Sequence, residues 1–235
     1  RVCQSGPFLC SFVATASAVL MANAIPVFVD INDVTLNMNP DLIEDAISEK
    51  TRVIMPVHIA GNPCHLTLIN EIAARHDIAM IEDAAQAHGA EWDGRKVGAF
   101  GAGGIFSFQS TKNMSAGEGG IIVSDDEAFI DSCFSYQNAG RVRSGAWYEH
   151  RHIGGNFRLS AFPAALLLAQ FEMLESDMKV RDQNAAILNE ALGKIAGLSV
   201  QKRYSETTRV SHHLYILLYD KLAFGDTSRE EFIDA

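Results

Sequence analysis

The stretch Ala79-Met80-Ile81-Glu82-Asp83-Ala84-Ala85-Gln86-Ala87-His88-Gly89-Ala90 decides the fold of this 235-residue chain. An apolar run ends in two acidic residues and is followed by small ones, which is typical of a buried parallel strand that ends in a tight turn. In open α/β sheets, ligands bind at the carboxyl ends of the strands. Asp83 is therefore placed to meet a ligand or, equally well, to cap a helix that starts in the Ala-rich turn.

A second stretch, Phe106-Ser107-Phe108-Gln109-Ser110-Thr111-Lys112-Asn113, places a lysine in a small, uncharged segment that opens onto Gly117-Glu118-Gly119-Gly120. A lysine in a loop is ordinarily a solvated surface residue. Burial or a cationic neighbour would instead lower the pKa of the Lys112 amine and free it as a nucleophile. Such an amine can form a Schiff base with a carbonyl substrate or with pyridoxal phosphate (PLP), and an aspartate facing the pyridinium nitrogen is the usual companion.

Around these two stretches, short apolar strands alternate with helices. The pattern predicts helices at 12–24, 40–48 and 66–76 and strands at 26–30, 52–57, 78–82, 103–108 and 120–124. Short strands separated by helices favour a largely parallel sheet that is covered on both faces. An apolar-periodic stretch from 160 to about 195 predicts one or two helices that lead toward a smaller domain, in which 211–220 is expected to be a strand.

The composition weighs against several classes of function. Hydrophobic residues make up 48% of the chain and charged residues 20%, as in an ordinary globular protein. The net charge of −10 and the lack of a Lys/Arg cluster argue against a nucleic-acid surface. Four cysteines without CxxC spacing fit free thiols in a reducing compartment, and no apolar stretch is long enough to span a bilayer. We therefore expect a cytoplasmic protein with no metal site and no nucleic-acid or membrane partner.

Both stretches resemble the DegT/DnrJ/EryC1/StrS sugar aminotransferases, a branch of the fold-type I (aspartate aminotransferase-like) PLP enzymes. The residues that carry the resemblance are 82–89, 106–108, 111–113 and 117–120, with support from 11–15, 26–30 and 155–159. The resemblance implies an α/β fold in which residues 1–178 form a three-layer α/β/α large domain with a mostly parallel sheet. Residues 179–235 would begin a small C-terminal α+β domain that is incomplete.

The resemblance also implies the two central residues of a PLP site. Lys112 matches the lysine that holds the PLP aldehyde and acts as general acid/base, and Asp83 matches the carboxylate paired with the ring nitrogen. The implied function is transfer of an amino group from L-glutamate or glutamine to a keto sugar, most often nucleotide-linked, for amino-sugar, lipopolysaccharide or antibiotic-sugar biosynthesis. A dehydratase branch of the family carries histidine at the position of Lys112. The lysine in this chain therefore favours amine transfer over deoxygenation. The alternatives are a ketocyclitol or amino-shikimate-type substrate, or a catalytically silent PLP-binding sensor or regulator.

Four further positions are implied cofactor contacts. Gln86 would lie near the phenolic oxygen of the ring, Ser107 would bind the phosphate, and Phe12 would stack on the ring. Asn156 would reach the phosphate of the neighbouring subunit's cofactor in a homodimer with a shared active site. From the residues alone, Ser107 could equally bond to backbone, Phe12 could pack in the core, and Asn156 could occupy a turn.

One departure from the family concerns the cofactor phosphate. The family's phosphate-binding turn lies at the start of a helix, a few tens of residues before 11–12, and a helix N-terminus is the usual place for such a group. This turn is not in the sequence, and 1–9 does not read like the family's usual strand. We therefore expect a partial chain that binds PLP weakly and turns over poorly by itself.

His58 and His88, beside a buried strand, are interpreted as structural.

Overall fold

The computed structural model describes residues 2–5 and 11–235, and its centre is a six-stranded sheet with the order β2-β1-β3-β4-β7-β8. The strands are β1 (Val2–Ser5), β2 (Pro26–Val29), β3 (Val53–Met55), β4 (Ala79–Asp83), β7 (Gly103–Ser107) and β8 (Gly120–Val123). Every neighbouring pair is parallel except β7 and β8, which pair antiparallel. The predicted, mostly parallel α/β sheet is confirmed.

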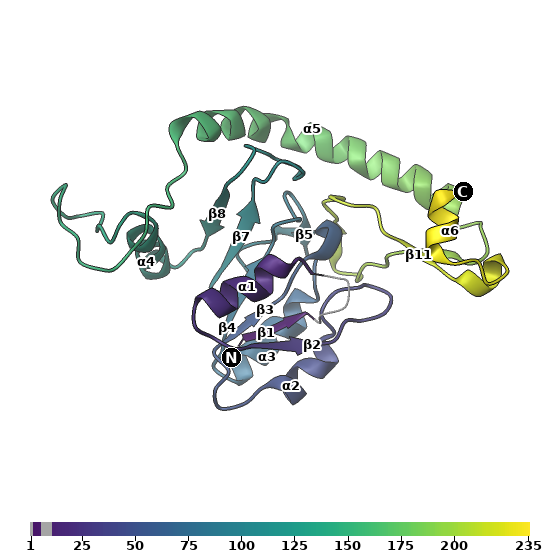
Figure 1. Cartoon of the computed structure of the whole chain (residues 1–235), viewed down its shortest axis with the longest axis horizontal. Helices are drawn as coiled ribbons and strands as arrows, with labels where there is room; N and C mark the ends of the chain where they lie inside the picture. The colour runs from purple at the N-terminus through teal and green to yellow at the C-terminus, as the bar shows by residue number, and fades with distance from the viewer. Residues whose placement is uncertain (1, 6–10) are drawn as a thin grey trace.

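Helices cover both faces of this sheet, as Figure 1 shows. Helix α1 (Val13–Met21) connects β1 to β2, whereas α3 (Leu66–Arg75) connects β3 to β4 in the opposite direction across the sheet. Because crossovers between parallel strands are right-handed, α1 and α3 lie on opposite faces. The short α2 (Ile43–Ala46), which follows the 3-10 turn η1 (Pro40–Leu42), packs against β2 and α3.

The main core lies between the sheet and α3. The apolar residues of α3 recur every three or four positions, and the buried ones are Leu66, Ile69, Ile72 and Ala73. Each fully buried leucine or isoleucine side chain contributes about 1.5–3 kcal/mol to folding. They pack against Ile54 and Met80 of the central strands, so the core fixes β4 and hence the position of its last residue.

Helix α5 (Ala161–Leu192) is a single, continuous helix that spans the molecule in Figure 1. Its buried residues, Leu167, Leu174, Met178 and Ala185, form one narrow stripe. The helical prediction for 160–195 is confirmed as one helix. The proposed domain boundary after residue 178 falls inside α5, so that division stays a prediction. Within the described residues, no helix combines the length and the apolar character needed to cross a membrane.

The remaining elements are short. They are η2 (Ile59–Gly61), β5 (Glu91–Trp92), β6 (Arg95–Lys96), α4 (Glu127–Gln137), β9 (Leu198–Val200), β10 (Thr207–Arg209), β11 (Leu217–Tyr219), η3 (Lys221–Phe224) and α6 (Arg229–Asp234). Strand β10 pairs with β5 and so ties the C-terminal region back to the segment that follows β4, while β11 pairs with β9.

Two local predictions are wrong. The expected strand at 211–220 is limited to β11, because residues 211–213 bond instead to the turn at residues 60–61, where Ser211 N donates to Gly61 O and His213 N donates to Ala60 O. The start of the chain does contain a strand, since residues 2–5 form β1 between β2 and β3. The rest of the 1–9 segment lies outside the described residues.

Candidate active site

Asp83 is the last residue of β4 and lies at the carboxyl edge of the sheet. Its side chain is buried, at 8% exposure, and both oxygens are bonded. Oδ2 accepts a 2.7 Å hydrogen bond from Thr15 Oγ1, and Oδ1 accepts one of 3.1 Å from the backbone N–H of Ala85. No helix follows in the sequence 84–90, so Asp83 anchors a turn and is not a helix cap.

Lys112 lies in the turn after β7, where its backbone N–H donates to Gln109 O at 2.9 Å. Its side chain is half-buried. Burial lowers the pKa of the Lys112 amine, and the negative charge of Asp83 opposes part of that shift. The amine is thus partly desolvated and lies within the electrostatic field of Asp83. The two residues that were singled out from separate stretches share one site.

Gln86 is held by an unusual turn in the neighbouring loop. Its Oε1 accepts a 2.6 Å hydrogen bond from the backbone N–H of Ala60, a residue with φ of 58°. Gly61 follows with φ of 87°, and a Cβ placed there would lie 2.5 Å from Ser211 Cβ and 2.7 Å from Gln86 O. Only glycine fits such a position, because other residues rarely adopt this φ and the space is filled.

Ser107 and Phe12 lie at the rim of the same edge. Ser107 ends β7, the strand next to β4, and its Oγ accepts a 3.2 Å hydrogen bond from Gln109 N. Phe12 precedes the first residue of α1 and is 69% exposed, so it is not a core residue. Thr15, one turn further along α1, contacts Asp83 and thereby places this end of the helix at the site.

Asn156 is the one predicted site residue that lies apart from the others. It forms an isolated antiparallel bridge with Asn138, which directly follows α4, and its Oδ1 accepts a 2.9 Å hydrogen bond from Arg158 Nε. Its side chain is exposed. The structure therefore brings Asp83, Gln86, Ser107 and Lys112 to one edge with Phe12 at its border, while Asn156 is on a separate segment.

Two histidines near Lys112 were not predicted to belong to the site. His88 is buried against the rings of Phe106 and Phe108, at 5.3 and 5.9 Å between centroids. Burial first, and then the charges of Lys112 and His213, lower its pKa to about 4. The Ser107 backbone opposes part of this shift, although neither ring nitrogen has a hydrogen-bond partner of good geometry among the described residues. His88 is therefore neutral at neutral pH.

His213 reaches the site from the C-terminal region. Burial first, and then the charges of Lys112 and Arg181, lower its pKa to about 4. The neighbouring Ser211 fixes this segment, because its Oγ donates to His88 O at 2.8 Å and its carbonyl accepts from Asn113 Nδ2 at 2.8 Å. The adjacent pair His212-His213 in an apolar run was the sequence signal that could have indicated this role.

His58, by contrast, has a structural role, as interpreted from the sequence. Its Nε2 lies 3.0 Å from Glu82 Oε2, and its Nδ1 accepts from Cys64 N, so the proton is on Nε2. Glu82 also accepts from the N–H groups of Gly98 and Phe100, at 2.8 and 2.6 Å. Burial alone would raise the pKa of Glu82, but His58 and the two N–H groups lower it overall. The pair fixes two loops, 56–65 and 97–102, to β4, next to Asp83.

This arrangement fits PLP. A buried carboxylate oriented by two hydrogen bonds suits a pyridinium nitrogen, and a partly desolvated amine in its field suits the cofactor aldehyde. Buried His88, whose ring nitrogens have no hydrogen-bond partner of good geometry among the described residues, lies in the same region beside Lys112.

Comparison with known proteins identifies the family of the chain. A model of the DegT/DnrJ/EryC1/StrS aminotransferase family matches residues 9–235. The L-glutamine:2-deoxy-scyllo-inosose aminotransferase of Micromonospora echinospora is 38% identical over 212 residues, which cover 86% of this chain and 50% of that protein. The chain spans about half the length of the curated relatives it matches.

Solved structures show the same fold. That of 3-amino-5-hydroxybenzoic acid synthase is similar with a TM-score of 0.85 and 34% identity, covering 92% of this chain and 56% of that one. That of DesI in the presence of its TDP-sugar product has a TM-score of 0.84 and 28% identity, covering 95% and 55%. The fold is that of the fold-type I PLP aminotransferases. Within this class, the chain belongs to the DegT/DnrJ/EryC1/StrS aminotransferase family.

Proposed function

We propose that the protein containing this chain is a PLP-dependent aminotransferase that moves an amino group from L-glutamate or L-glutamine to the ketone of a nucleotide-linked sugar. The observation that carries the proposal is the half-buried Lys112 amine in the field of the buried Asp83 carboxylate. An amine with a lowered pKa is a better base and nucleophile near neutral pH than an exposed lysine. Membership of an aminotransferase family supports the same chemistry.

PLP, when bound, supplies an aldehyde and an electron-withdrawing ring. Asp83 would face the ring nitrogen, with its oxygens oriented by Thr15 and by the N–H of Ala85. The Lys112 amine would remove the α-proton of the amino donor and deliver it to the neighbouring reacting carbon. Gln86 and Ser107 would donate to cofactor oxygens, with Phe12 over the ring.

His88 and His213 would present neutral imidazoles to the same space. Their pKa values of about 4 keep them uncharged at neutral pH, so they do not compete with Lys112 for a proton there. Their proximity to Lys112 also means that protonation of either ring in acid would add a like charge beside the amine. We therefore propose that His88 and His213 set a neutral environment around the Lys112 amine, which acts as the proton-transfer group.

The acceptor follows from the relatives' names. A TDP-sugar product is recorded for DesI, which supports a nucleotide-linked keto sugar, with a role in amino-sugar, lipopolysaccharide or antibiotic-sugar biosynthesis. A second candidate is a ketocyclitol, because the relative from Micromonospora echinospora is named for 2-deoxy-scyllo-inosose. Both acceptors are ketones on a hydroxylated six-membered ring, so the amine-transfer chemistry is the same.

We also propose a homodimer with a shared active site. Asn156 is exposed and apart from the site of its own chain, so it is free to act in another. Large apolar side chains are exposed in its neighbourhood, namely Ile153 (97%), Phe157 (64%) and Phe162 (90%). Apolar surface of this extent normally marks an interface.

The net charge of −10 and the free thiols of Cys64 and Cys133 agree with a cytoplasmic location.

The test is an amination assay on the intact protein. The protein is incubated with PLP, 15N-labelled L-glutamate or L-glutamine, and in separate reactions a panel of nucleotide keto sugars and 2-deoxy-scyllo-inosose, and products are read by mass. We expect one acceptor to gain the labelled nitrogen, and none to do so with Lys112→Ala. A protein that holds PLP but labels no acceptor would be a sensor and would contradict the proposal.

A further inference from the structure

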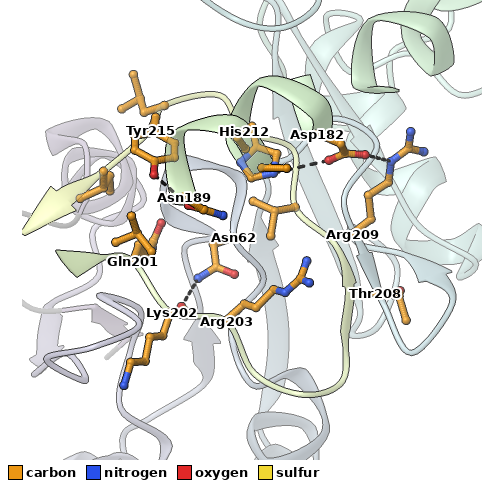
Figure 2. Close-up of a pocket in the computed structure, with 16 residues that line it drawn as sticks. Asn62, Asp182, Asn189, Gln201, Lys202, Arg203, Thr208, Arg209, His212 and Tyr215 are labelled. Atoms are coloured by element: carbon orange, nitrogen blue, oxygen red, sulfur yellow. Dashed lines mark hydrogen bonds and ion pairs between the residues drawn. The ribbon is translucent and has the colours of Figure 1, made fainter. Parts of the chain in front are cut away.

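A cavity of about 510 Å³ lies outside the proposed active site. It is bounded by the second half of α5 and by the chain segments 200–203 and 208–216, and Figure 2 shows its lining. None of the six predicted site residues lines it. His212 lines the cavity, whereas the next residue, His213, interacts with Lys112. The segment 212–213 therefore forms a wall that the cavity and the active site share.

The cavity contains a buried acceptor without a donor. Asn62 is only 2% exposed, and its Nδ2 donates to the backbone oxygen of Lys202 at 2.9 Å. Its Oδ1 has no hydrogen-bond partner among the described residues. In Figure 2 this oxygen points away from Lys202, toward the side of the cavity where Arg203 lies. A buried acceptor left unpaired destabilises a protein by about 1–3 kcal/mol, so its site is suited to a ligand donor.

The cavity also contains an uncompensated positive charge. Asp182 is the acidic residue of its lining, and it is already shared by Arg209 Nε at 3.7 Å and His212 Nε2 at 3.4 Å. Arg203 has neither an ion pair nor a hydrogen bond within the described part of the chain. Its guanidinium extends into the middle of the cavity in Figure 2. The charge of Arg203 reaches His212. Burial is the main cause that lowers the pKa of His212, Arg203 and Arg181 lower it further, and Asp182 raises it in part.

We propose that this cavity binds a small oxyanion that also carries a hydroxyl or amino group. The oxyanion, a carboxylate or a phosphate, would lie on the Arg203 guanidinium, whose planar fork matches both groups. The hydroxyl or amino group would donate to Asn62 Oδ1. This site goes beyond the proposed function and does not rest on it, because it uses neither Lys112 nor Asp83.

Calorimetric titration of the intact protein tests the proposal with two matched pairs of probes. Glycolate is compared with acetate, and sn-glycerol 3-phosphate with methyl phosphate, so that each pair differs in the donor for Asn62. We expect the hydroxylated member of at least one pair to bind with a Kd of about 1 mM or below, about tenfold more tightly than its partner. The pair that binds identifies the anion as carboxylate or phosphate.

The variants Arg203→Gln and Arg229→Gln separate this cavity from other anion sites. Both arginines are exposed, and Arg229, on α6, is outside the cavity. We expect about a tenfold loss of affinity in Arg203→Gln and none in Arg229→Gln, with unchanged melting temperatures. The bound anion should also raise the pKa of His212, followed by NMR of its ring protons. Equal binding by Arg203→Gln, no difference within either pair, or no binding at all would overturn the proposal.

Discussion

Thr15 Oγ1 donates a 2.7 Å hydrogen bond to Asp83 Oδ2 and so joins the first turn of α1 to the carboxyl end of β4. Both residues are buried, and they lie 68 positions apart in the sequence. A buried hydrogen bond to a charged acceptor is worth about 1.5–3 kcal/mol. In the proposed enzyme, this bond fixes the orientation in which the Asp83 carboxylate faces the nitrogen of the cofactor ring.

Replacing Thr15 by valine tests this orientation. The variant keeps the shape of the side chain but removes the donor, so we expect kcat of amine transfer to fall by about 10- to 100-fold, in line with the energy of such a bond. The pH at which the absorbance of bound PLP changes should shift as well. Thr15→Ser keeps the hydroxyl and is the matched control. A valine variant with unchanged kcat and spectrum would show that Asp83 needs no such support.

Replacing Gly61 by alanine should displace the turn that holds Gln86. A Cβ at Gly61 would meet Ser211 Cβ at 2.5 Å and Gln86 O at 2.7 Å, and the residue has φ of 87°. We expect a loss of more than about 2 kcal/mol in unfolding free energy by urea titration, from backbone strain and overpacking together. Gly94→Ala is the control, because φ there is 74° but no atom lies within 4 Å. Equal losses of unfolding free energy in the two variants would mean that the whole effect comes from the positive φ and none from the filled space at Gly61.

Acid should destabilise the fold through His88. Its pKa is about 4 in the folded state and near 6.5 when unfolded, so between these values the unfolded state binds more protons. The unfolding free energy must therefore fall as pH decreases from about 6.5 to about 4, and His213 contributes in the same direction.

The variant His88→Phe isolates this contribution. Subtracting its unfolding free energy from that of the unmodified protein at each pH cancels the other titrating groups. We expect the difference to change across the window from about pH 6.5 to about pH 4, and to be flat above it. A pH-independent difference for His88→Phe would mean that His88 titrates normally.

Breaking the buried His58–Glu82 pair should be costly. In Glu82→Gln, one end of the carboxylate becomes a donor that faces the N–H of Gly98 or Phe100, or the proton on His58 Nε2. Disrupting a buried charged network of this kind typically costs about 3–5 kcal/mol. Glu44→Gln, which removes an exposed ion pair with Arg75, should change stability little. Similar urea midpoints for the two variants would contradict the structural role.

The sequence predicted the sheet and the two central residues because both depend on local patterns. The run 79–83 is apolar and ends in acid, and the segment around Lys112 is small and flanked by glycine, so each stretch indicates its own structure. Thr15 could not be assigned in this way, since its role arises from a contact with Asp83, 68 positions away. The strand predicted at 211–220 failed for the same reason, because the polar groups of Ser211 bond to distant loops.

The central claim is that the Lys112 amine holds the cofactor aldehyde, and reduction with borohydride tests it most directly. The intact protein is incubated with PLP, reduced, digested and analysed by tandem mass spectrometry, with Lys112→Arg treated in parallel. The account predicts a single phosphopyridoxyl group on Lys112 and none in the variant. A modification on another lysine, or an equally modified variant, would contradict it.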